Sequence, residues 1–217
     1  MKAENTVPVQ CPICKHLYDA PAVRVVDVCR DEELKRKLES GELFRFDCPD
    51  CGNRMRLGYS FMYQDSDIRE YIYLSKENPM DDGCSADQIV RNAMFMAEGK
   101  TDDAILRIVY SEKDLREKIR IFENGLDDRI VELCKGITIS QFPATEELFV
   151  TDIRYDNIGG QELFVLTCSD GTEQYALNFA EIYGQILGEY ESILPPLRDN
   201  IFSCIDLEYA AAFLRGL

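Results

Sequence analysis

The sequence lacks the features of several large protein classes. No run of about 18 consecutive apolar residues occurs, which excludes a transmembrane helix. The first residues, MKAENTVPVQ, contain no apolar stretch of signal-peptide length, so we expect the protein to remain in the cytoplasm. No Walker loop, GxSxG elbow or GxGxxG motif is found, and His16 is the only histidine. A Cys-His or Ser-His triad is therefore difficult to build, and we assign no catalytic residue.

Basic residues are scarce in the second part of the chain. The 217 residues carry a net charge of −16, with 46% hydrophobic and 29% charged residues, which is typical of a globular protein. Residues 1–76 hold 12 Lys/Arg and 13 Asp/Glu, whereas residues 77–217 hold 12 and 27. An acidic surface repels phosphate backbones. This distribution argues against DNA or RNA binding by the whole chain, and leaves such binding open only for the near-neutral N-terminal part.

Cysteine, in contrast, is abundant, and two Cys-Pro-x-Cys units stand out among the nine cysteines. Cys11 and Cys14 lie in CPIC, and Cys48 and Cys51 lie in CPDC. In a turn of this length both sulfurs point to one side, as two corners of a zinc tetrahedron require. In a reducing cytoplasm, paired cysteines indicate a metal site or catalysis and not a disulfide framework. The sequence therefore predicts one structural Zn²⁺ held by these four cysteines.

Two objections to this site can be weighed from the sequence. The segment 15–47 between the pairs is longer than in an ordinary zinc ribbon. However, doubling a closed loop costs only about 0.6 kcal/mol, whereas structural zinc contributes roughly 10–16 kcal/mol in small peptides. A thioredoxin-like redox site needs a helix directly after Cys-x-x-Cys, and neither KHLYDAPAV nor GNRMRLGYS predicts one. Redox chemistry is thus the weaker interpretation. His16 could replace one cysteine as a metal ligand, but we expect it to be an exposed neighbour of the site.

The residues around the cysteines resemble the CpXC protein family. The resemblance rests on CPIC, CPDC, the GELF that precedes the second pair and the aromatic strand that ends in YQD, all within residues 10–75. The later stretch DLREKIRIFENGLDD is similar to a segment of some members. The resemblance supports the metal interpretation of Cys11, Cys14, Cys48 and Cys51, and it implies no reaction.

The pattern of elements predicts an α+β fold. Residues 1–76 are expected to form a zinc-ribbon-like β module with a short helical insertion, residues 77–88 a linker, and residues 89–217 an acidic α+β domain with an antiparallel meander. In the module we expect strands at 21–29, 43–48, 57–63 and 69–75 and a helix at 31–42. In the second domain we expect helices at 85–99, 111–134 with a break, 179–194 and 206–216, and strands at 103–111, 147–155, 162–168 and 172–179.

Other groups of residues have a structural interpretation that we favour over a functional one. Five aromatic residues are expected to pack on one face of a small core and not to form a nucleic-acid stacking platform, because no dense basic patch accompanies them; they are Tyr59, Phe61, Tyr63, Tyr71 and Tyr73. Most of the unpaired cysteines are expected to be small buried hydrophobes; the unpaired cysteines are Cys29, Cys84, Cys134, Cys168 and Cys204. The carboxylate pairs 102–103, 127–128 and 146–147 are expected to be solvated at helix starts and turns.

The sequence thus predicts a zinc-binding protein with a structural Cys₄ site that acts in protein–protein interaction or regulation through a protein partner. An enzyme with its site in the C-terminal domain is an alternative from another class. Nucleic-acid binding by the N-terminal module is a third. The sequence leaves the biological process, the identity of the partner and the oligomeric state open.

Overall fold

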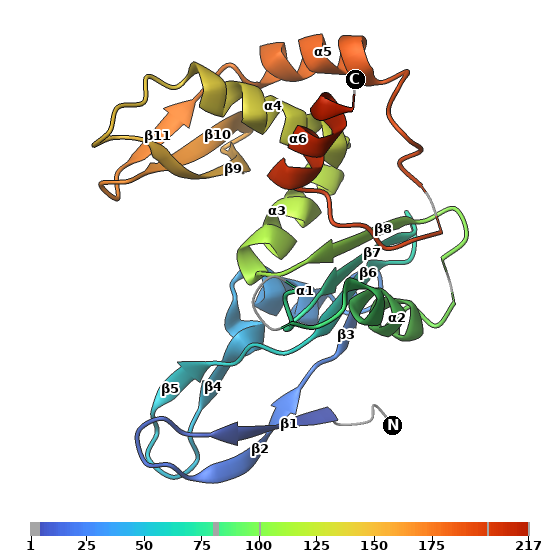
Figure 1. Cartoon of the computed structure of the whole chain (residues 1–217). Helices are drawn as coiled ribbons and strands as arrows, with labels where there is room; N and C mark the ends of the chain where they lie inside the picture. Colours follow the sequence, from blue (N-terminus) through green and yellow to red (C-terminus); the bar gives the residue numbers. More distant parts are fainter. Residues whose placement is uncertain (1–4, 80–82, 100, 199, 217) are drawn as a thin grey trace. The chain divides into compact units, whose positions relative to one another are not determined.

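A computed structural model describes residues 5–79, 83–99, 101–198 and 200–216, and it divides into two compact units (Figure 1). Unit 1 contains the chain up to Leu115 together with 198–203, and unit 2 contains the remainder. Helices and sheets occur in both units, which confirms the predicted α+β class. None of the described helices combines the length and the apolar character needed to cross a membrane.

Two short antiparallel hairpins carry the cysteine pairs of unit 1. The first pair lies between β1 and β2, and the second pair lies between β4 and β5. The elements of unit 1 are, in chain order, β1 (Asn5–Gln10), β2 (Leu17–Ala22), β3 (Val25–Asp27), α1 (Glu32–Glu39), the 3₁₀ turn η1 (Glu42–Phe44), β4 (Arg45–Asp47), β5 (Arg54–Arg56), β6 (Phe61–Asp65), β7 (Glu70–Leu74), α2 (Ala86–Met96) and β8 (Ile105–Val109). The predicted strand 21–29 is divided between β2 and β3, and β1 was not predicted.

A four-stranded mixed sheet forms the centre of unit 1, in the order β3-β6-β7-β8. The β6–β7 pair is antiparallel, and the two outer pairs are parallel. Helix α2 packs on one face through Ile89, Ala93 and Ala97, whose spacing of four residues places them on one side of the helix. Phe44 of η1 contacts Phe61 of β6. The sheet is consequently buried between helical elements.

The aromatic residues of this sheet are buried, as predicted, but they do not share one face. Tyr71 and Tyr73 belong to the cluster under α2. Tyr63 pairs with Ile72 in the β6–β7 register, and Ile72 lies between Tyr71 and Tyr73. Because successive side chains of a strand alternate between the two faces, Tyr63 and Ile72 point to the opposite face from these tyrosines. The expectation of a single face was wrong because both faces of this sheet are covered.

Unit 1 includes chain segments that the sequence assigned to the second domain. β8 pairs with β7, and Ser203 forms a parallel bridge to Arg107 of β8. The Ile108 N–H donates to the Ser203 carbonyl at 3.0 Å, and the Ser203 N–H donates to the Leu106 carbonyl at 3.2 Å. The predicted division into independently folding parts, at 1–76, 77–88 and 89–217, stays a prediction. Residues 80–82 of the expected linker lie outside the described residues.

Unit 2 consists of an antiparallel meander and a group of helices. The sheet order β11-β10-β9 confirms the predicted meander. Helix α4 contacts α5, α6 and β9, and the ring of Phe179 in α5 packs against Tyr155 and Phe164 of the sheet. Helix α3 (Glu112–Glu123) begins in unit 1 and leads into the elements of unit 2, which are α4 (Asp128–Gln141), β9 (Val150–Ile158), β10 (Gln161–Cys168), β11 (Glu173–Ala176), α5 (Phe179–Tyr190) and α6 (Leu207–Arg215).

Candidate metal centre

Each Cys-Pro-x-Cys unit folds into the same tight turn between two strands. In the first turn, the Cys11 N–H donates to the His16 carbonyl at 2.9 Å and the Lys15 N–H donates to the Cys11 carbonyl at 3.0 Å. In the second, the Cys48 N–H donates to the Asn53 carbonyl and the Gly52 N–H donates to the Cys48 carbonyl, both at 2.9 Å. The two turns are therefore equivalent knuckles, each fixing a pair of sulfurs.

The residue after each knuckle has a left-handed backbone. Gly52 has φ +69° and Lys15 has φ +62°. This conformation is free for glycine, whereas for other residues it costs roughly 1–2 kcal/mol. Lys15 adopts it nevertheless, and its Nζ donates to the Pro12 carbonyl at 2.9 Å. The departure from glycine at the first knuckle thus leaves the backbone geometry unchanged.

The structure brings the four predicted ligands together. All four sulfur atoms lie within 4.8 Å of one another. The Cys11 and Cys51 sulfurs are 3.7 Å apart, and those of Cys14 and Cys48 are 3.6 Å apart. Four sulfurs at about 2.3 Å from a central zinc would be separated by about 3.8 Å, and a disulfide would place two of them at about 2.05 Å. The spacing fits a tetrahedral cation site and excludes disulfides in this structure.

The thiols of the cluster titrate unequally. Backbone N–H groups of Cys14 and Ile13 hold the pKa of Cys11 down to about 6. The His16 N–H also acts to lower the pKa of Cys14, but burial and the neighbouring sulfurs outweigh it and raise this pKa to about 12. A first thiolate therefore forms readily and disfavours ionisation of its neighbours. A bound divalent cation removes this penalty and allows all four to ionise.

The surroundings of the cluster agree with a metal site better than with a redox site. The chain continues into β2 after the first pair and into β5 after the second, so no helix N-terminus lies directly behind either pair to activate a thiol. His16 is exposed and stacks near Tyr18, with ring centroids 6.1 Å apart, and it is not part of the sulfur group. Arg54, which flanks the second knuckle, pairs with Asp47 at 3.0 Å.

The sequence led us to expect that most of the remaining cysteines are buried, but only two of the five are. Cys134 and Cys168 are buried, whereas Cys84 and Cys204 are half-buried and Cys29 is exposed. The Cys29 thiol lies 3.1 Å from an Asp65 carboxylate oxygen. Within the described residues, the four knuckle cysteines are the only group of three or more potential ligands close enough to hold one cation.

Unit 2 contains a buried ionic cluster that the sequence did not predict. The Lys118 Nζ lies 3.3 Å from Asp128 and 3.0 Å from Glu132, and the Lys135 Nζ lies 3.0 Å from Glu132 and 2.8 Å from Glu117. All five side chains are buried. Asp128 was expected to be solvated, and this was wrong, whereas its neighbour Asp127 does cap α4 by accepting the Arg129 N–H.

A signal for this cluster exists in the sequence. Asp128, Glu132 and Lys135 recur at helical spacing on a helix that is otherwise apolar on several sides. Burial raises the pKa of the Glu117 carboxyl, although Lys135 opposes this. With three carboxyls and two ammonium groups, retention of a proton by Glu117 brings the cluster closer to charge balance. The cluster is thus satisfied by the chain itself.

The comparison with protein families agrees with the cysteine pattern. The model of the CpXC protein family matches residues 9–135, more than half of the chain. This chain belongs to the CpXC protein family. The match begins before the first knuckle and runs through both cysteine pairs and the central sheet to Lys135 in α4, so it reaches further than the motifs alone. No curated protein and no solved structure matches the chain.

The donor set defines the chemistry available at this centre. Four thiolates are soft ligands that favour Zn²⁺ or another thiophilic cation over Mg²⁺ or Ca²⁺. A site with four protein ligands is coordinatively closed, in contrast to catalytic zinc sites, which keep a position for water. The residues therefore fit a metal that holds the two hairpins together, with no open position for a substrate.

Proposed function

We propose that this protein binds one structural Zn²⁺ through Cys11, Cys14, Cys48 and Cys51, and that it works through contact with a protein partner. The observation that carries the metal part is the convergence of four sulfurs from two hairpins within 4.8 Å. The hairpins are short and expose many side chains. A bound cation supplies cross-linking that such a small core cannot.

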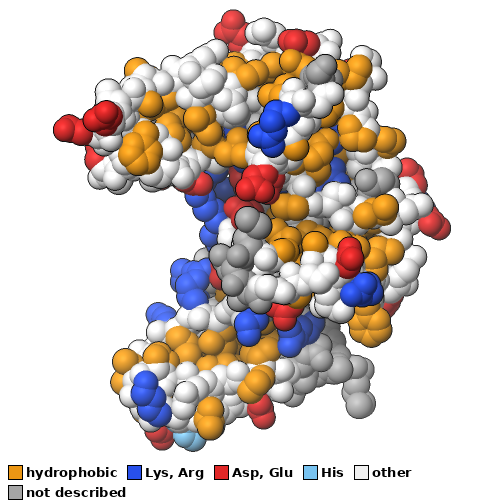
Figure 2. Space-filling model, in the orientation of Figure 1, with side chains coloured by type: hydrophobic (Ala, Val, Ile, Leu, Met, Phe, Trp, Pro, Cys, Tyr) orange, Lys and Arg blue, Asp and Glu red, His pale blue; other side chains and the backbone are white. Residues whose placement is uncertain are grey.

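Exposed apolar side chains on the first knuckle support the partner part of the proposal. Ile13, inside the turn that the metal would hold rigid, is 69% exposed, and Leu17, the first residue of β2 after the turn, is 70% exposed. The matching position in the second knuckle is Asp50, so the apolar character does not follow from the knuckle geometry. Figure 2 shows apolar side chains gathered over the region of β1, β2, β4 and β5. A rigid, exposed apolar turn suits the centre of a small protein interface.

The metal part is tested by elemental analysis combined with a thiol count. Protein purified without chelators should contain one equivalent of zinc, and addition of a chelator should release it and make four more thiols reactive. Cys29→Ser, which removes an exposed cysteine outside the cluster, should leave the zinc content unchanged. Protein that contains no zinc and does not take it up would contradict the metal site.

The partner part is tested by affinity capture from the native cell extract with the full chain. We expect a specific protein to be retained by the wild type and lost with the double variant Ile13→Ser/Leu17→Ser. The control is Ile158→Ser/Ile193→Ser, which changes two exposed isoleucines of unit 2 (53% and 51%). A protein retained equally by all three, or no retained protein together with turnover of a small molecule, would contradict this role.

A further inference from the structure

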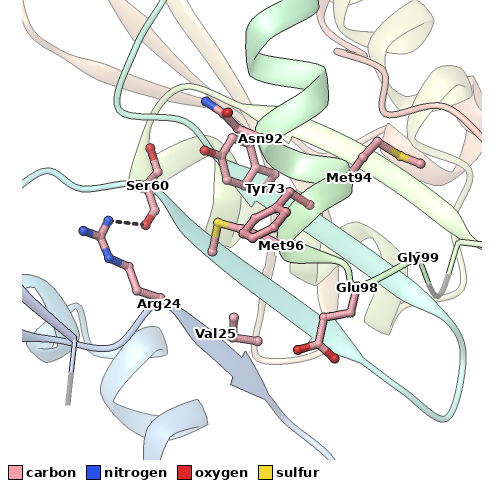
Figure 3. Close-up of a pocket in the computed structure, with 10 residues that line it drawn as sticks. Arg24, Val25, Ser60, Tyr73, Asn92, Met94, Met96, Glu98 and Gly99 are labelled. Atoms are coloured by element: carbon pink, nitrogen blue, oxygen red, sulfur yellow. Dashed lines mark hydrogen bonds between the residues drawn. The ribbon is translucent and has the colours of Figure 1, made fainter. Parts of the chain in front are cut away.

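A cavity of about 830 Å³ lies in unit 1 and shares no residue with the sulfur cluster. Its walls come from Arg24 and Val25 at the start of β3, from Ser60 before β6, and from the C-terminal part of α2, as Figure 3 shows. Tyr73 of β7 also lines it. Pockets that bind small ligands usually enclose about 300–1,000 Å³. The size therefore suits a small molecule.

The α2 side of the cavity is apolar and adaptable. Phe95 is 85% exposed beside the cavity, while the residues that anchor α2 to the core, such as Ala93 and Ala97, are buried. Met94 and Met96 are half-buried on either side of it in the chain. Methionine fits irregular surfaces because its side chain is flexible and polarisable. Met94 and Met96 also pack against the buried cluster under α2. Core packing does not explain the exposed Phe95 between them, whereas an apolar ligand body would cover it.

Arg24 provides a positive charge at the strand side of the same cavity. Its Nη1 donates to the Ser60 carbonyl at 3.2 Å, and its guanidinium carbon lies 5.6 Å from the centre of the Tyr59 ring. The group is therefore held in place before any ligand arrives. A guanidinium has five N–H donors. The Ser60 carbonyl accepts a hydrogen bond from Nη1 of Arg24 only. The other donors suit an anion.

The charges around the cavity set an orientation. Arg24 is the only Lys or Arg among the described lining residues, and Glu98 lines the cavity beyond Val25 (Figure 3). An anionic group is attracted to Arg24 and repelled from Glu98. A carboxylate matches the planar fork of a guanidinium better than a spherical anion does. We propose that this cavity binds a small apolar carboxylate, with its charged end at Arg24 and its body against Met94, Phe95 and Met96.

The absence of tryptophan from the chain allows a direct test. In the variant Phe95→Trp the introduced indole is the only tryptophan, so its fluorescence reports on the cavity alone. Octanoate should change this fluorescence in a saturable manner, and octylammonium should not. In the unmodified chain, octanoate should displace the fluorescent anion 8-anilinonaphthalene-1-sulfonate, which guards against an effect of the indole itself.

Arg24→Gln, made in the Phe95→Trp background, should weaken octanoate binding at least about tenfold, in keeping with the loss of a charged hydrogen bond. Binding of octanol, which carries no charge, should be unchanged by this substitution and shows that the cavity remains formed. The matched control is Arg91→Gln, which should leave octanoate binding unchanged. Arg91 is an exposed residue of α2 and is not one of the residues that line the cavity. Equal octanoate affinity in the Arg24→Gln variant, tighter binding of octyl phosphate than of octanoate, or no saturable signal with either readout would overturn the proposal.

Discussion

The sulfur cluster of unit 1 and the ionic cluster of unit 2 differ in how the negative charge of their acidic groups is compensated. Each brings several acidic groups together in a small volume. In unit 2, the carboxyls of Glu117, Asp128 and Glu132 face the ammonium groups of Lys118 and Lys135. In unit 1, the described structure supplies no ammonium or guanidinium group to the four thiols, since Lys15 bonds to Pro12 and Arg54 to Asp47.

An external cation is needed where the chain supplies no positive groups of its own. A buried carboxylate cluster that carries its own lysines is complete when the chain has folded. A cluster of four thiols can ionise fully only if a cation enters from solution. Unit 1 should therefore depend on metal for its stability, and unit 2 should not.

The largest expected effect is the loss of a ligand. Cys48→Ser should abolish tight zinc binding and unfold the two hairpins, because structural zinc contributes roughly 10–16 kcal/mol in small peptides and a domain is stable by only about 5–15 kcal/mol. Hydrogen exchange of β1, β2, β4 and β5 should become fast while exchange in α4 and β10 stays slow. Slow exchange in the hairpins of this variant would contradict the dependence of unit 1 on metal.

The next effect concerns the chain's own cations. Lys135→Met leaves Glu117 and Glu132 buried without this ammonium group, and should destabilise unit 2 by about 3–5 kcal/mol. Chemical denaturation followed at unit 2 measures the change, with zinc content expected to remain normal. Arg215→Met, an exposed cation of the same unit, should change stability by less than about 0.5 kcal/mol. A loss below about 1 kcal/mol for Lys135→Met would show that the cluster does not need its lysine.

A smaller effect tests the two knuckles against each other. Gly52→Ala should cost about 1 kcal/mol, because alanine is strained at φ +69° although nothing obstructs its Cβ. Lys15→Gly should stabilise the chain by about 0.5 kcal/mol, because relief of the strain at φ +62° exceeds the entropy that glycine adds to the unfolded chain. Denaturation midpoints of the zinc-loaded variants measure both changes. Shifts of the same sign would contradict the equivalence of the knuckles.

The smallest effect is at the surface of the second knuckle. The Arg54 and Asp47 side chains are 74% and 60% exposed, so solvent screens their ion pair. Arg54→Ala should leave zinc affinity and the denaturation midpoint nearly unchanged. A marked fall in zinc affinity would assign Arg54 a role in balancing the charge of the centre.

The sequence predicted the local elements and the four cysteines well because both depend on short-range patterns. The Asp170-Gly171 pair predicted the turn between the last two strands of the meander, and Gly171 has φ +82° there. The apolar spacing of Leu115, Ile119 and Phe122, which are buried, predicted α3. The cysteine cluster could be predicted from the sequence because the spacing within each pair fixes the direction of its sulfurs.

The sequence did not predict the features that depend on distant contacts. The parallel pairing of β7 with β8, and the bridge between Arg107 and Ser203, join segments with no shared local signal. Tyr71 and Tyr73 were placed on the wrong face because the register of the β6–β7 hairpin pairs Tyr63 with Ile72 between them. The cavity near Arg24 arises where β3, β6 and α2 meet, and none of these segments reveals it alone.

X-ray absorption at the zinc edge, on full-length protein purified without chelators, identifies the ligand atoms of the bound metal and so decides whether the four cysteines hold it. We expect a single shell of four sulfur neighbours at about 2.3 Å and no shell of nitrogen or oxygen. The same spectrum should be lost in Cys48→Ser and retained in Cys29→Ser. A zinc-free protein, or a first shell that contains oxygen or nitrogen ligands, would contradict a closed centre built from the two knuckles.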